Sequence, residues 1–238
     1  DGHWLASGGD FGGITIWDVA SGEELLRLSG HDGKVTELAF SPDGRTLSSF
    51  GVDAQGYRWN LEPKPADGRR ASFAELWDAL DQPKPADAYR AQWRLIADPK
   101  GATAFLRDHL KPIPAPDAVT IRKWIAELDN DAFSVREAAS DELTKIGEPV
   151  LAPVREAIES KTSGETFRRL KQILRTVSND RGPRSVRSMR AIMVLERIGT
   201  PGARALLEAM SRGAPGTRAT EEAAAALQRL DKIVAQGP

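Results

Sequence analysis

Few side chains in this sequence could act as a base, a nucleophile or a metal ligand. The chain has no cysteine, which excludes thiolate nucleophiles, thiolate metal sites and disulfides. Its histidines are His3, His31 and His109. His109 stands alone near the expected end of a helix, where an imidazole is usually solvated or complements the helix dipole. Histidine-based chemistry would therefore have to involve His3 or His31.

The glycines and the acidic residues offer no catalytic pattern either. Gly8-Gly9 and Gly12-Gly13 fall at expected turns between strands, whereas a phosphate-binding loop lies between a strand and a helix. Carboxylate pairs such as Asp129 and Asp131 fall at expected helix starts, where acids cap backbone N–H groups and favour the helix dipole. We therefore expect a non-enzymatic protein, with no catalytic residue, no cofactor and no metal ligand set.

The first part of the chain contains two copies of one pattern, offset by 42 residues. The aligned residues are Leu5 with Leu47, Ser7 with Ser49, and Trp17-Asp18 with Trp59-Asn60. The second copy begins at Gly30-His31. A period of this size, with Gly-His near its start and Trp-Asp near its end, is typical of a four-stranded propeller blade. Residues 1–61 therefore resemble the WD-repeat β-propeller proteins.

This resemblance implies a buried, hydrogen-bonded tetrad in the second copy. In the WD-repeat family the tetrad joins a His, a Ser or Thr, an Asp in a tight turn and a Trp, which here are His31, Ser49, Asp53 and Trp59. A carboxylate can fix the imidazole tautomer, a hydroxyl can bridge, and a buried indole N–H needs an acceptor. We interpret the four residues as structural. The first copy departs from the pattern, because Phe11 stands where the second copy has Asp53.

Residues 1–61 are expected to form six strands in two three-stranded blades, that is, an incomplete antiparallel β-propeller with an open ladder edge. The segment Glu62-Pro63-Lys64-Pro65 cannot supply a fourth strand, because proline has no N–H to donate to a ladder. The chain starts at Asp1-Gly2 without a methionine. We therefore expect it to be a fragment, with further blade strands upstream.

After a linker at residues 62–71, the apolar residues follow a helical period, which predicts an α-helical domain over residues 72–238. The proline-rich residues 111–116 mark a candidate sub-boundary within it. Residues 131–149 resemble a HEAT repeat, and a second copy of their last part follows at an offset of 52 residues. We expect nine or ten helices in an all-α, HEAT-like solenoid, and so an α and β multidomain protein. This domain order resembles the C-terminal region of large bacterial multi-repeat proteins.

One basic stretch lies within the helical part, at residues 168–190. The cations expected on helix faces are Arg168, Lys171, Arg175, Arg184, Arg187 and Arg190. They could form a solvated or internally paired face, a site for an acidic protein partner, or a nucleic-acid site. A nucleic-acid site would want stacking aromatics as well, and the only aromatic nearby is Phe167, which we place in the core. We expect residues 168–177 and 184–198 to pack side by side, with the arginines pointing outward.

The leading functional hypothesis is a non-enzymatic scaffold for protein–protein interaction, because propellers and helical repeats offer broad, rigid binding surfaces. The alternatives are a nucleic-acid or acidic-partner site on the basic helices, and the regulatory tail of a larger enzyme whose catalytic domain lies upstream. The net charge is −1, and no run of residues approaches the ~18 apolar residues of a membrane span. The lack of cysteine favours a reducing, cytoplasmic location.

Overall fold

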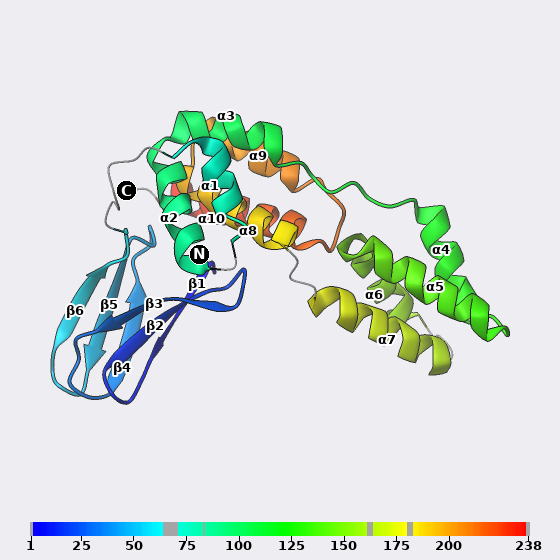
Figure 1. Ribbon diagram of the computed structural model, residues 1–238, viewed down its shortest axis with the longest axis horizontal. Helices are drawn as coiled ribbons and strands as arrows, with labels where there is room; N and C mark the ends of the chain where they lie inside the picture. Colours follow the sequence, from blue (N-terminus) through cyan, green and yellow to red (C-terminus); the bar gives the residue numbers. More distant parts are fainter. Residues whose placement is uncertain (1, 64–70, 83, 161–163, 180–182, 237–238) are drawn as a thin grey trace.

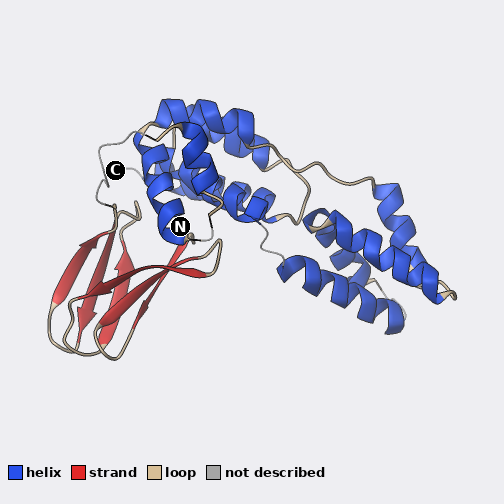
Figure 2. Ribbon diagram, viewed as in Figure 1, coloured by secondary structure: helices blue, strands red, loops and turns tan. Residues whose placement is uncertain are grey.

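Strands form the first part of the chain and helices form the rest (Figure 1, Figure 2). The computed structural model describes residues 2–63, 71–82, 84–160, 164–179 and 183–236. Most of the predicted linker, residues 64–70, lies outside the described residues. In Figure 1 the sheets lie at one end of the molecule and helices α4–α7 at the other, with the remaining helices between them.

Two separate three-stranded antiparallel sheets are present, with strand orders β1-β2-β3 and β4-β5-β6. The strands are β1 (Trp4–Gly8), β2 (Gly13–Asp18), β3 (Glu23–Ser29), β4 (Val35–Phe40), β5 (Thr46–Gly51) and β6 (Gly56–Asn60). The prediction of six strands in two sheets is confirmed. The strands pair in the same register in both sheets. Leu5 faces Trp17 across the first hairpin, and the equivalent residues Leu47 and Trp59 face each other across the second. The sequence repeat is thus a repeat in structure.

Alternation along the strands places one side of each strand in a common core. Ile14 and Ile16 on β2 are fully buried, and so is Leu47 on β5. The same cluster includes Tyr89 and Trp93 from a helix that follows the linker. The sheets and the helices therefore share apolar packing.

The helices begin where the sequence supplies caps and N-terminal prolines. Ser72 and Glu75 form a capping box at the first helix, and Asp98 with Pro99 opens the third. The helices are α1 (Phe73–Ala79), α2 (Pro85–Ala97), α3 (Pro99–His109), α4 (Ala118–Glu127), α5 (Phe133–Ile146), α6 (Leu151–Glu159), α7 (Gly164–Asn179), α8 (Pro183–Ile198), α9 (Pro201–Met210) and α10 (Arg218–Gln236), with a 3₁₀ turn η1 (Glu148–Val150).

These helices build two apolar cores. The first joins α1–α3 with α8–α10 around residues such as Leu106, Leu195 and Leu207. The second joins α4–α7 around Leu143 and Leu170. Residues 111–116 lie in the extended connection between α3 and α4, and so between the two cores.

The expected solenoid is not confirmed. In a solenoid each repeat contacts only its neighbours along the chain, whereas here α8 packs against α2, α9 and α10. The prediction that α7 and α8 pack side by side is wrong. Leu170 and Leu174 of α7 belong to the second core, whereas Ile192 and Leu195 of α8 belong to the first.

Candidate functional site

The structure brings the four residues of the proposed tetrad together. His31 Nδ1 lies 3.0 Å from Asp53 Oδ1, and His31 Nε2 lies 2.8 Å from Ser49 Oγ. The indole N–H of Trp59 donates to the same Ser49 oxygen, at 2.8 Å. Ser49 comes from β5 and Trp59 from β6, while the loops before β4 and after β5 supply His31 and Asp53.

The donor and acceptor roles follow from the carboxylate. Ionised Asp53 only accepts, so the proton sits on His31 Nδ1, and Nε2 then accepts from the Ser49 hydroxyl. Burial raises the pKa of Asp53, but donation from the backbone N–H groups of Asp32 and Gln55 and from His31 outweighs it. The net effect lowers the pKa of Asp53, so the carboxylate stays ionised and holds the imidazole in one tautomer.

An Asp–His–Ser chain is also the arrangement of a serine nucleophile, but here the serine is enclosed. Ser49 is 0% exposed, and its oxygen already accepts from Trp59. Gly51 makes room for the pair beside it, because a Cβ at that position would lie 2.6 Å from His31 Nδ1. The four hydrogen-bonded side chains connect β5 and β6 to two loops. Ser49 is not exposed at the surface as a nucleophile.

Replacing Ser49 with alanine should lower the free energy of unfolding by about 2–3 kcal/mol, because His31 and Trp59 would each lose a buried partner. Ser7→Ala is a matched control, since Trp17 donates to Ser7 at 2.9 Å in an exposed position of the first copy. We expect Ser7→Ala to cost less than about 1 kcal/mol. Equal losses in urea unfolding of the two variants would contradict the structural role of the buried chain.

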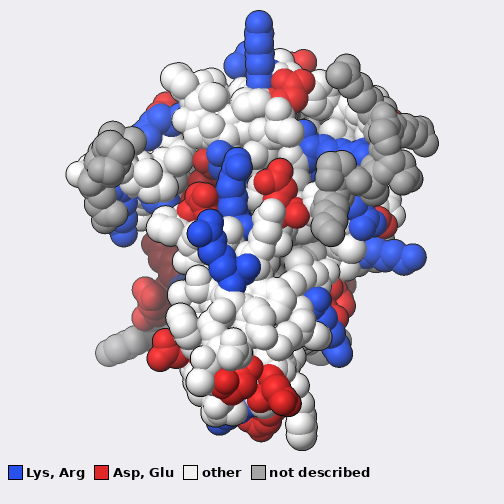
Figure 3. All heavy atoms as spheres, turned by 90° about the vertical axis from the view of Figure 1, so that its left-hand side faces the viewer, with Lys and Arg blue, Asp and Glu red and all other residues white. Residues whose placement is uncertain are grey.

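The loops at the end of the sheets away from the helices (Figure 1) expose two large apolar side chains. Phe11 is 98% exposed and Val52 is 64% exposed. The loops are joined by backbone hydrogen bonds, from Val35 N to Gly9 O and from Val52 N to Lys34 O. We call this surface the loop end, defined as residues 9–12, 30–34 and 52–55. Figure 3 shows Asp and Glu side chains gathered at this lower end of the sheets.

Sequence reasoning missed a buried ion pair between the sheets and the helices. Both Nε and Nη2 of Arg190 donate to Asp18 Oδ2, at 3.1 and 2.6 Å. The two side chains are only 2% and 6% exposed. Arg190 also donates to the backbone oxygen of Leu80, at 2.7 Å. Asp18 at the end of β2 is thereby fixed to α8.

A second buried network joins the same two parts. His3 Nε2 lies 2.8 Å from Glu196 Oε2 of α8. Arg229 of α10 donates to both oxygens of Glu196, each at 2.7 Å, and also to Glu222. Among the described residues, His3, Glu196 and Glu222 are the group whose composition suits a metal ion. Arg229 already supplies the cation between the two carboxylates, so we interpret the group as an ion-pair network.

The predicted basic patch is wrong as a single surface. Arg190 is buried against Asp18, and Arg187 pairs with Asp81 of the helical part while its guanidinium lies over Trp77. Arg184 lies in α8, but its side chain is outside the described residues. Arg168, Lys171 and Arg175 are exposed on α7. The cations of α7 and α8 do not share one surface, because the two helices belong to different cores.

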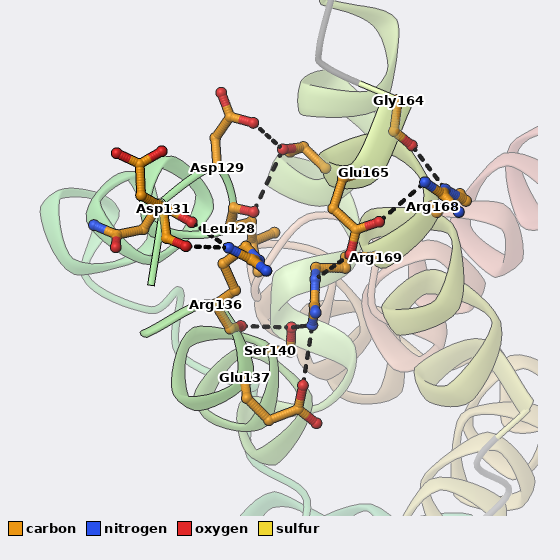
Figure 4. Close-up of polar contacts among 12 residues, drawn as sticks. Leu128, Asp129, Asp131, Arg136, Glu137, Ser140, Gly164, Glu165, Arg168 and Arg169 are labelled. Atoms are coloured by element: carbon orange, nitrogen blue, oxygen red, sulfur yellow. Dashed lines mark hydrogen bonds and ion pairs between the residues drawn. The ribbon is translucent and has the colours of Figure 1, made fainter. Parts of the chain in front are cut away.

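Arg169, which also lies in this stretch, pairs with one acid of its own helix and one of a preceding helix. Arg169 donates to Glu165 at 2.9 Å and to Glu137 of α5 at 3.1 Å (Figure 4). Arg136 donates to the backbone oxygens of Asn130 and Asp131 nearby. A polar groove of 520 Å³ lies between α5 and α7 beside these contacts. Arg169 therefore holds α5 and α7 together and is not free for a partner.

Comparison with known proteins finds a WD40 repeat in this chain. The model of the family described as "WD domain, G-beta repeat" matches residues 22–60, the segment that holds all four residues of the tetrad. Nuclear distribution protein PAC1-1 of Uncinocarpus reesii is 35% identical over 86 residues, which cover 33% of this chain and 18% of that protein. Periodic tryptophan protein 2 homolog of Dictyostelium discoideum is 35% identical over 60 residues, or 25% of this chain and 6% of that protein.

A shorter match is Centriole proteome protein 16 of Chlamydomonas reinhardtii, 51% identical over 45 residues, or 19% of this chain and 2% of that protein. The chain thus spans less than a fifth of the length of each of these three relatives. No solved structure matches it. None of the described helices combines the length and the apolar character that crossing a membrane would require.

Proposed function

We propose that this chain is part of a protein-interaction scaffold, in which two blades of an incomplete β-propeller carry a rigid helical tail. The WD40 repeat and its WD-repeat relatives support this class of function. The tail is fixed to the blades by Asp18–Arg190 and His3–Glu196. A partner bound to the blades would therefore be held at a defined position relative to the helices.

The observation that carries the proposal is the exposure of Phe11 and Val52 on the loop end. Phe11 is almost fully exposed, and aromatic residues are enriched among the side chains that dominate the energy of protein interfaces. The backbone hydrogen bonds between the loops fix the surface before binding, which reduces the entropy lost on association. Asp10 and Asp32 beside the apolar residues are exposed, and they favour a partner with a basic rim.

Affinity capture with the full chain, read by mass spectrometry, tests this proposal. The variant Phe11→Ser/Val52→Ser should lose specific proteins by about tenfold or more, because it removes the apolar anchors. Leu5→Ser/Val119→Ser is the matched control, since those side chains are also more than half exposed but lie elsewhere. Capture of the same proteins by the loop-end variant and the wild type would refute this use of the surface.

A further inference from the structure

The outer face of α7 exposes an aromatic residue and three cations in a row. They are Phe167, Arg168, Lys171 and Arg175, and we call them the α7 stripe. Phe167 is 40% exposed, although its position in the sequence suggested a core residue. The stripe and Gln172 line a shallow hollow of 460 Å³. In Figure 1, α7 lies at the end of the molecule opposite the sheets.

The charges of the stripe are only partly neutralised by the protein. Arg168 pairs with Glu165, 3.1 Å away. The Lys171 ammonium lies 5.2 Å from the centre of the Phe167 ring, in a cation–π contact. Within the part of the chain that the structure describes, neither Lys171 nor Arg175 forms an ion pair with a carboxylate. Two exposed cations one helical turn apart, about 6 Å along the axis, are thus available.

We propose that the α7 stripe docks an acidic segment of a partner protein, with an apolar side chain of that segment against Phe167. Carboxylates one turn apart on a helix match the spacing of Lys171 and Arg175, and charge complementarity gives the docking its orientation. The proposal deepens the scaffold function, on which it rests, by giving it a second binding surface at the opposite end from Phe11.

An acidic protein segment suits the stripe better than a nucleic acid does. Single strands are bound by several aromatic side chains on which successive bases stack, along a groove of cations. The stripe offers a single aromatic side chain, Phe167, and so cannot stack successive bases in this way.

The test measures binding of a short, dye-labelled helical peptide to the full chain by fluorescence anisotropy. The peptide carries Glu residues four positions apart and a Leu on the same helix face. The charge reversal Lys171→Glu/Arg175→Glu should weaken binding by about tenfold or more, and Phe167→Ala by a few-fold. Arg58→Glu/Lys100→Glu is the control, with the same change in net charge at exposed positions elsewhere. We expect it to change the affinity less than about twofold.

Three results would overturn the proposal: no binding of the acidic peptide by the wild type, equal losses in both double variants, or tighter binding of single-stranded DNA or RNA. Higher salt should weaken peptide binding without abolishing the effect of Phe167→Ala, since apolar contact is not screened. The loop-end variant Phe11→Ser/Val52→Ser should bind the peptide normally. If the α7 stripe does not bind the peptide but capture of proteins still depends on Phe11, only the α7 proposal is refuted and the scaffold proposal is retained.

Discussion

Replacing Asp18 with alanine should lower the free energy of unfolding by about 3–5 kcal/mol, the largest effect we expect from any single change at a polar residue of this chain. The variant leaves the Arg190 guanidinium buried without its carboxylate, and a buried charge cannot recover its hydration. Asp18 also accepts from the Ser21 hydroxyl at 2.7 Å, so the turn after β2 loses support as well. Urea unfolding followed by tryptophan fluorescence measures the loss.

Two further variants distinguish the loss of the buried ion pair from a nonspecific loss of stability. Glu24→Ala breaks the exposed pair with Arg27 and should cost far less stability than Asp18→Ala, because solvent screens exposed pairs. Asp18→Ala/Arg190→Met should recover part of the loss, because an apolar replacement of a whole buried pair is often neutral. If Asp18→Ala costs no more than Glu24→Ala, the pair does not hold the sheets to α8.

The structure of the β part could be predicted from sequence because its signals are local. Period-2 alternation, turn residues and the repeat at 42 residues all lie within residues 1–61, and they specify strands, register and hairpins together. The prediction of the tetrad rests on the resemblance to the WD-repeat family and not on residue spacing alone. The need for a glycine at position 51, where a Cβ would collide with His31, is visible only in the structure.

The junction between the sheets and the helices could not be predicted in the same way. Asp18 and Arg190 are 172 residues apart, and His3 and Glu196 are 193 apart. Helical periodicity shows that a face is apolar but does not show which helix covers it. Proximity in sequence favours packing of α7 against α8, whereas the two helices belong to different cores. One signal was available: residues 191–195 are all apolar, and all five are buried. Five consecutive apolar residues cover every side of a helix turn, so this part of α8 is expected to be surrounded by other elements.

Lowering the pH should remove stability through Glu196, which belongs to α8. Burial raises the pKa of Glu196, but hydrogen bonds from Arg229 and His3, with their charges, lower it to about 2. The folded pKa thus lies below the unfolded value of about 4.3. The contribution is fully present above the unfolded pKa and is lost as the pH falls through the folded pKa. A shift of this size corresponds to about 3 kcal/mol.

Unfolding in urea at several pH values between about 6 and 2 tests this contribution. Over that interval the wild type should lose about 3 kcal/mol more stability than Glu196→Gln, which has no carboxyl group to titrate at this position. Glu37→Gln, an exposed residue of β4, is the control and should keep the wild-type pH profile. Because Glu196 binds His3 from the start of the chain, acid should loosen the sheets from α8 before the core of α4–α7 unfolds. Identical pH profiles for Glu196→Gln and the wild type would show that the network at His3 contributes nothing to holding the two parts together.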